Sequence, residues 1–274
     1  MNLYNFFSKI VQKLQGNIFN YTHLSVRGSK KHLNPVLLID RWERYHRVIT
    51  SKTKNHFKPV LSNKTVFELG CGPMLGWGPL VLFLGAKKFI GCEPGFQKKA
   101  TFSKYVKNNY FRQHYNELVS NYGNRMSFNT FYKKLKNSNI LKTADELNKI
   151  KTCIQIILSN SVLEHINQNN LFKTLEKIWI KAKKNAFFFH AIDMGPHKPI
   201  SLQNWYKKNI KKQILLNLLR INDFFLLIKT FNPTRIYLVV YRSQCINKKS
   251  VAKMWKNYTV NNLKVKTGFI FGYK

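Results

Sequence analysis

Short apolar runs alternate along the chain with longer amphipathic stretches, and this alternation predicts an α/β fold. The runs at 66–69, 88–92, 153–160 and 185–192 are short and mostly apolar, as strands buried in a sheet are. Between the first two runs, residues 79–84 are apolar throughout and are followed by a glycine, which predicts a short buried helix with a glycine C-cap.

Further elements follow from the same patterns. Helices are expected at 35–49, 96–123 and 170–184, a third strand at 125–130, and two closing strands at 236–241 and 265–271. Residues 1–14 place their apolar side chains on one helical face, so this helix either packs on the domain or lies on a membrane surface. Because no repeat or low-complexity linker divides the chain, we expect an N-terminal helix and basic connector at 1–34, followed by one domain at 35–274.

A glycine-rich corner follows the first strand, and an acid ends the second. The corner contains Gly70, Gly72, Gly76 and Gly78, and the acid is Glu93. Glycines let the backbone approach a ligand closely, and a carboxylate at the tip of the second strand can accept hydrogen bonds from two ribose hydroxyls. This order of strand, glycine loop, helix, strand and acid predicts a nucleotide-binding βαβ unit.

The corner does not fit the dinucleotide fingerprint, because Leu75 stands where the third glycine should be. Residues 68–72, E-L-G-C-G, instead resemble the first motif of class I S-adenosylmethionine-dependent methyltransferases, which is acid-x-Gly-x-Gly. Glu93, 23 residues after Gly70, stands in the place of the ribose-binding acid of that family.

A second motif supports the same resemblance. Residues 159–166, S-N-S-V-L-E-H-I, resemble the segment that ends the fourth strand of many small-molecule methyltransferases. Two features depart from the family: Gln155 replaces an acid near the start of that strand, and the third glycine is displaced to Gly76 or Gly78. The resemblance implies a Rossmann-like, seven-stranded, mostly parallel sheet with its last strand antiparallel and helices on both faces.

The resemblance also implies S-adenosyl-L-methionine as the cofactor and assigns roles to individual residues. The glycines would admit the cofactor, Glu68 would organise its amino-acid end, and Glu93 would hold its ribose. The residues expected to bind the cofactor are Glu68, Gly70, Cys71, Gly72, Glu93, Ser159, Asn160 and Val162. Asp145 is a candidate for adenine contact, although a helix start capped by Thr143 explains it equally well.

Candidate catalytic and acceptor-binding residues follow the later strands. His190, Asp193 and His197 form an H-x-x-D-x-x-x-H segment that resembles one in a bacterial subset acting on small molecules or glycan-type acceptors. A histidine there can take a proton from an acceptor, and a carboxylate can orient its ring; capping of the strand end by hydrogen bonds is the alternative. We expect His190, Asp193 and His165 to be catalytic and His197 to contact substrate.

Two further segments could face the acceptor. Arg220 lies in an N-x-L-R-x-x-D segment that resembles a helix start in the same bacterial subset; it could bind an anionic or hydroxyl-rich acceptor, or form a surface ion pair with Asp223. Arg41, Tyr45 and His46, on the helix expected before the first strand, either face substrate or are solvated.

The charge of the chain raises a different question about its partners. Its 47 basic and 11 acidic residues give a net charge of +36, which is explained either by genome base composition or by binding to nucleic acid or acidic lipid. Four of the eleven acids, Glu68, Glu93, Glu164 and Asp193, fall at predicted strand ends, where open α/β sheets bind ligands. The motif after the fourth strand is neither N-P-P-Y nor Pro-Cys, and no basic arm with interleaved aromatic residues is evident.

The cysteines and the apolar segments indicate the cellular location of the protein. Four cysteines without a C-x-x-C pair predict neither a disulfide framework nor a zinc site, so we expect a reducing, cytoplasmic location. A location peripheral to the inner face of the membrane is the alternative. The sequence contains no run of about 18 uncharged apolar residues, so no membrane-spanning helix is expected. The N-terminus has no signal-peptide cleavage pattern.

Together these features predict an enzyme that transfers a methyl group to an oxygen or nitrogen of a small-molecule or glycan-type acceptor. A nucleic-acid (RNA) methyltransferase or nucleic-acid-binding protein, prompted by the charge, is one alternative. A non-catalytic protein that keeps the fold is another.

Overall fold

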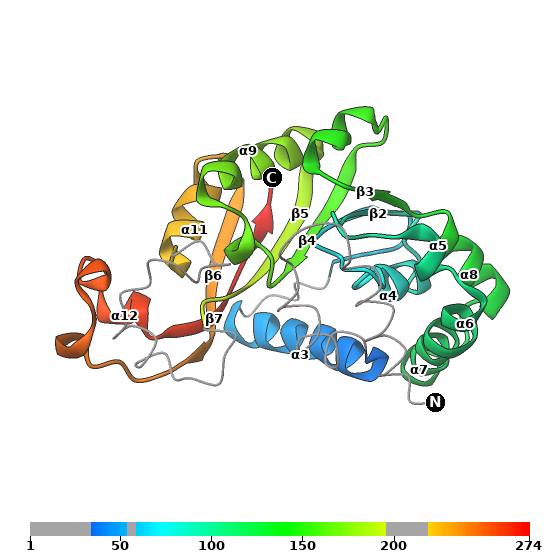
Figure 1. The fold of residues 1–274 in the computed structure, drawn as a ribbon, viewed down its shortest axis with the longest axis horizontal. Coiled ribbons are helices and arrows are strands. Elements are labelled where there is room, and N and C mark those ends of the chain that lie inside the picture. The colour runs from blue at the N-terminus through cyan, green and yellow to red at the C-terminus, as the bar shows by residue number, and fades with distance from the viewer. Residues whose placement is uncertain (1–33, 54–58, 196–218) are drawn as a thin grey trace.

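The computed structural model describes residues 34–53, 59–195 and 219–274, and within these ranges seven strands form a single sheet (Figure 1). The strand order is β3-β2-β1-β4-β5-β7-β6. The strands are β1 (Thr65–Leu69), β2 (Lys88–Cys92), β3 (Asn139–Leu141), β4 (Ile154–Asn160), β5 (Ala182–Asp193), β6 (Arg235–Ser243) and β7 (Val265–Tyr273). The pairs among β1 to β5 are parallel, whereas β7 is antiparallel to both β5 and β6. This confirms the predicted sheet, which is mostly parallel with its last strand antiparallel.

Helices cover both faces of the sheet, as expected. On one face lie α3 (Pro35–Thr53), α4 (Gly78–Phe83), α7 (Arg112–Tyr122) and α8 (Phe128–Lys136); on the other lie α9 (Gln168–Lys181) and α11 (Ile221–Lys229) (Figure 1). Shorter helical segments are α5 (Lys98–Thr101), α6 (Lys104–Val106), α12 (Val260–Leu263), a π-helical turn (Lys107–Phe111) and 3₁₀ turns at Ala144–Lys149, Leu163–His165, Lys248–Ser250 and Lys253–Trp255. The apolar core therefore has two parts, one on each side of the sheet.

Within the described residues, the third strand lies elsewhere than the sequence pattern predicts. Residues 125–130 were expected to form it, but α8 begins within this segment, where the Ser127 hydroxyl accepts a hydrogen bond from the Thr130 amide at 3.2 Å. The side chains that α8 buries follow helical spacing and are Phe128, Phe131, Tyr132 and Leu135. The third strand is instead β3, which pairs in parallel with β2.

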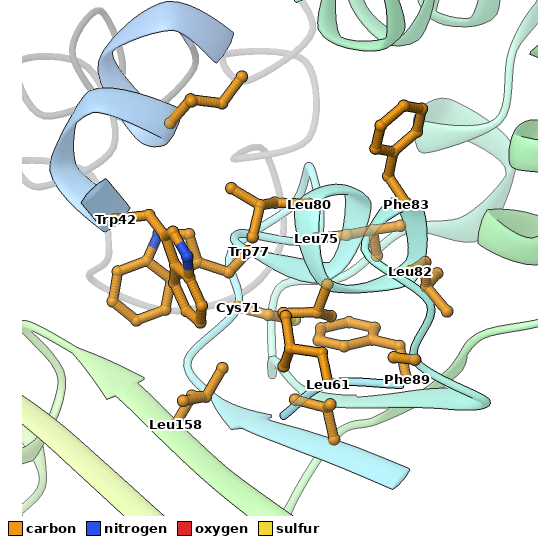
Figure 2. Packing of buried hydrophobic residues seen from close by; sticks show 14 of the residues in the cluster. Trp42, Leu61, Cys71, Leu75, Trp77, Leu80, Leu82, Phe83, Phe89 and Leu158 are labelled. Carbon is orange, nitrogen blue, oxygen red and sulfur yellow. The ribbon is translucent and has the colours of Figure 1, made fainter. Parts of the chain in front are cut away.

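Helix α3 is fixed against the glycine-rich corner by aromatic packing. Trp42 of α3 meets Trp77, just before α4, edge to face with ring centroids 5.3 Å apart. Figure 2 shows this pair above Leu158 of β4, with Leu75 and Leu80 of the corner and α4 close by. Because these side chains are almost fully buried, α3 is held over the carboxyl ends of β1 and β4.

The N-terminal helix expected at 1–14 lies outside the described residues, as does almost all of the connector up to 34. Along the described chain, no helix is both long enough and apolar enough to cross a membrane.

Candidate functional site

The glycines of the corner are required by its geometry. Gly70 and Gly72 have φ angles of +69° and +66°, a region that residues with a side chain rarely adopt. A Cβ on Gly70 would lie 2.3 Å from Cγ2 of Val162, so its absence lets the turn after β4 pack directly on the corner. A Cβ on Gly72 would meet no atom of the described residues within 4 Å. The backbone at Gly72 is therefore open to a ligand.

Glu68, near the end of β1, anchors the glycine-rich corner. Its side chain is buried, and its Oε2 accepts a hydrogen bond from the Trp77 amide at 2.9 Å. A Cβ on Gly76 would come within 2.5 Å of Oε1, so the loop closes tightly around the carboxyl group. Burial raises the pKa of Glu68 well above its ordinary value, more than the hydrogen bond from Trp77 lowers it. The residue thus ties the end of β1 to the start of α4.

Glu93 reaches from the end of β2 to the glycine corner. Its Oε2 accepts a hydrogen bond from the Gly72 amide at 3.0 Å, and its Oε1 accepts one from the Gly95 amide at 3.0 Å. Burial raises the pKa of Glu93, while the two amides and Lys142 act in the opposite direction. The predicted ribose acid and the predicted cofactor loop therefore meet at one place.

The end of β4 directs its polar side chains to both sides of the sheet. The Ser159 hydroxyl lies 2.8 Å from Nδ1 of His190, which is its register partner on β5. The next residue, Asn160, is approached from the α3 side, where the Tyr45 hydroxyl donates a long hydrogen bond of 3.5 Å to its Oδ1. Adjacent residues on a strand face opposite sides, so Ser159 and Asn160 belong to different environments.

The same alternation separates two of the predicted catalytic residues. His190 is buried in the sheet, and burial lowers its pKa to about 3. Asp193 lies three residues further along β5, on the side of Phe189 and Ala191, which pack in the cluster that contains α3. His190 and Asp193 therefore do not form a pair, and the hydrogen bond of the histidine goes to Ser159.

A buried carboxyl group links the end of β5 to the turn that follows β4. Glu164 accepts a hydrogen bond from the Asp193 amide at Oε1, 3.1 Å away, while its Oε2 has no hydrogen-bond partner among the described residues. Burial raises the pKa of Glu164 well above its ordinary value. His165, in the same turn after β4, is half-buried.

Arg220 is buried, and its guanidinium binds main-chain oxygens. Nη1 donates to the Met194 carbonyl at 3.1 Å and Nη2 to the Val265 carbonyl at 2.9 Å, which joins the end of β5 to the start of β7. The ion pair considered with Asp223 is not formed; that carboxylate accepts hydrogen bonds from the Arg220 amide and the Tyr258 hydroxyl instead. His197, the other expected substrate residue, lies outside the described residues.

Tyr45 emerges as the central side chain on the α3 side. Its ring packs 4.6 Å from that of Phe269 and 5.6 Å from that of Tyr241, measured between centroids. Burial raises the pKa of Tyr45 to about 12, so its hydroxyl remains a donor at neutral pH. The sequence pointed to Tyr45 only as one of three residues on this helix, because nothing in the pattern of a helix shows which turn will face a strand end.

Asp145, the candidate for adenine contact, lies in the 3₁₀ turn that follows β3. It is exposed and forms an ion pair with Lys177 of α9. Thr143 is the N-cap of the following 3₁₀ turn, but its side chain makes no capping hydrogen bond. Across the ranges that the structure describes, no group of three or more His, Cys, Asp and Glu residues is arranged to hold a metal ion.

Comparisons with known proteins identify similar folds but no family. No protein-family model matches the chain, and no curated protein matches it. Among solved structures, a SAM-dependent methyltransferase from Archaeoglobus fulgidus is 12% identical, with a TM-score of 0.45 over 86% of this chain and 99% of that one. An O-methyltransferase family protein from Burkholderia thailandensis is 7% identical, with a TM-score of 0.46 over 99% and 68% of the two chains.

A third structure of this kind contains a bound ligand. The magnesium protoporphyrin IX methyltransferase from Synechocystis PCC 6803, solved with bound SAH, is 11% identical, with a TM-score of 0.41 over 96% of this chain and 92% of that one. At such identities and TM-scores, the similarity carries no argument about activity. The functional case depends on the site itself.

Proposed function

We propose that the chain is an S-adenosylmethionine-dependent methyltransferase that transfers a methyl group to an oxygen or nitrogen of a small-molecule or glycan-type acceptor. The observation that carries this proposal is the contact between Glu93 and Gly72. It joins a carboxylate that can bind two ribose hydroxyls to a stretch of backbone that a ligand can approach without meeting a side chain.

The residues of the corner fit the cofactor. Gly72 leaves one face of the loop open to the cofactor. The Glu93 carboxylate supplies hydrogen-bond acceptors for the ribose, and Glu68 fixes the loop through the Trp77 amide. When bound, S-adenosylmethionine supplies an activated methyl group. The chain then has to hold the acceptor at attack distance and receive its proton.

On the acceptor side, the proposal favours residues that face α3. Asp193 is half-buried on that side and can accept the proton of a hydroxyl or amine, while Asn160 and the protonated Tyr45 can orient the acceptor. His190 acts as a positioning residue through Ser159, and His165 lies at the turn that follows β4.

Calorimetric titration with S-adenosylhomocysteine tests the cofactor site. We expect micromolar affinity in the wild type and a loss of about 1.5–3 kcal/mol in Glu93→Ala, because two hydrogen bonds to the ribose are lost. Glu176→Ala is the matched control, because Glu176 is a half-buried glutamate on α9. This variant should bind S-adenosylhomocysteine like the wild type. Unchanged affinity in Glu93→Ala would show that the ribose site is wrongly assigned.

One observation favours a second candidate, a protein that acts on or binds nucleic acid. After Asp223, the chain carries ten basic residues and no acidic one up to its last residue. Salt-dependent retention on RNA, with a steep loss between low and physiological salt, is the result expected for this candidate.

A further inference from the structure

A row of residues crosses the edge of the sheet where β5 and β6 end and β7 begins. Thr267 of β7 is the register partner of Asp193 on β5 and also of Arg242 on β6. Because neighbouring strands lie about 4.8 Å apart, the row from Asp193 to Arg242 spans roughly 10 Å. β7 is antiparallel to both neighbours, so its first residues meet the last residues of β5 and β6.

A β-bulge turns the end of β6 toward α3. The register with β7 shifts between Val240 and Arg242, and Tyr241 stacks on Phe269 with ring centroids 5.0 Å apart. The Arg242 guanidinium lies 5.1 Å from the centre of the Tyr241 ring. Arg242 therefore lies beside the same aromatic cluster that Tyr45 joins.

Helix α3 packs against this edge of the sheet through Tyr45. Tyr45 contacts the Tyr241 ring at 5.6 Å and reaches Asn160 with its hydroxyl, so it spans from the end of β6 to the end of β4. Arg41 lies one helical turn before Tyr45, and Arg41 and Arg242 both act electrostatically on the tyrosine hydroxyl. Asp193 is the carboxylate that acts on the same hydroxyl.

The charge of this edge is positive on balance. Of the charged groups that act on the Tyr45 hydroxyl, two are guanidinium groups and one is a carboxylate, and no acid within the described ranges forms an ion pair with Arg242, which is exposed. An arginine fork binds a carboxylate or a phosphate with two parallel hydrogen bonds. An exposed arginine fixed beside a proposed reaction site is thus suited to select a charged ligand.

We propose that this edge is the acceptor site and that it takes an acceptor with a carboxylate or phosphate group, bound by Arg242. The nucleophilic hydroxyl or amine of the acceptor then lies toward Asn160 and Asp193. This inference rests on the proposed methyltransferase function, and it narrows the acceptor to anionic hydroxyl or amino compounds.

Two pairs of probes that differ in charge test the inference and separate the two kinds of anion. The first pair is 3,4-dihydroxybenzoate and 3,4-dihydroxybenzamide; the second is glucose 6-phosphate and glucose. Affinities are measured at constant ionic strength, with and without S-adenosylhomocysteine. In at least one pair, we expect the anion to bind roughly ten-fold more tightly than its neutral partner.

Arg242→Gln should reduce that preference to less than two-fold and leave S-adenosylhomocysteine binding unchanged. Arg235→Gln is the matched control, since Arg235 is an exposed arginine at the other end of the same strand, about 23 Å away. This variant should keep the preference.

Equal affinity within both pairs, absence of binding by all four probes, or a preference that survives in Arg242→Gln would overturn the inference. A wild type that fails to bind S-adenosylhomocysteine would instead count against the proposed function, since the charge preference is also measured without it.

Discussion

Oε2 of Glu93 accepts a hydrogen bond from the Gly72 amide at 3.0 Å, which joins the end of β2 to the loop that follows β1. These two residues are 21 positions apart in the sequence and are brought together because β1 and β2 are parallel neighbours. The contact fixes the distance between the two parts of the proposed nucleoside site. Gly72 therefore has two roles. It adopts the left-handed backbone conformation of the loop, and it leaves one face of the loop open.

Gly72→Ala separates these two purposes. The left-handed φ should cost about 1 kcal/mol of stability, because an alanine adopts it with strain but meets no neighbour. Affinity for S-adenosylhomocysteine should fall at least ten-fold, because the new methyl group would occupy the face that the ligand approaches. Isothermal titration and urea unfolding measure the two effects.

Gly123→Ala is the matched control for this variant. Gly123 follows α7 with a φ of +75°, and a Cβ there would also meet nothing within 4 Å. It should show the same loss of stability as Gly72→Ala and normal ligand affinity. Equal affinities in the two variants would mean that the corner does not receive the ligand.

Gly70→Ala should destabilise the fold more strongly than either of these variants. Its Cβ would lie 2.3 Å from Cγ2 of Val162, so overpacking adds to the backbone strain, for a total of about 2–4 kcal/mol. Chemical denaturation measures the free energy of unfolding. Adding Val162→Ala should recover part of the overpacking term, whereas simple addition of the two losses would show that the clash is not its source.

The corner, β1, α4, β2, β4 and β5 could all be predicted because each is specified locally. An apolar run of five to seven residues, a glycine or a polar residue at its end and an acid at the tip are visible in the sequence itself. The misplaced third strand shows the limit of this reasoning. Phe128, Phe131 and Leu135 fit a helical face, and that pattern outweighs the strand expected at 125–130, where only two of the six residues are apolar.

The arrangement of the reaction side could not be predicted, because it depends on register between strands. Ser159 meets His190 only because they are register partners on β4 and β5. The H-x-x-D spacing predicts one functional unit, yet three residues along a strand bring His190 and Asp193 to opposite faces. No sequence motif marks Arg242, since only the bulge in β6 and the neighbouring Asp193–Thr267 pair give it a place in the site.

Arg220→Met tests whether this residue holds the fold or the acceptor. Its guanidinium donates to two carbonyls on different strands, so we expect a loss of about 2–4 kcal/mol in the free energy of unfolding. Arg220→Lys should recover little, because one ammonium cannot reproduce the fork that spans Met194 and Val265. Normal stability in both variants, with weakened acceptor binding, would restore the substrate role expected from the sequence.

His114 should make the protein sensitive to acid. Its ring is fully buried on α7, and neither nitrogen has a hydrogen-bond partner among the described residues. Burial lowers its pKa from 6.5 to about 3, so the unfolded chain binds a proton that the folded chain excludes between these values. Stability contributed by this residue is therefore complete above pH 6.5 and is lost as the pH falls toward 3, by up to about 1.4 kcal/mol per pH unit.

His114→Phe removes this titration while keeping an aromatic ring beside Tyr110. The free energy of unfolding of the variant, measured by urea denaturation from pH 4 to pH 8, should fall less steeply with acid than that of the wild type. The difference between the two proteins should be constant above pH 6.5 and should change progressively below it. The buried carboxyl groups of Glu68 and Glu164 titrate in both proteins, so they cancel from this difference. Parallel profiles over the whole range would show that His114 gains a proton partner or solvent in the folded protein.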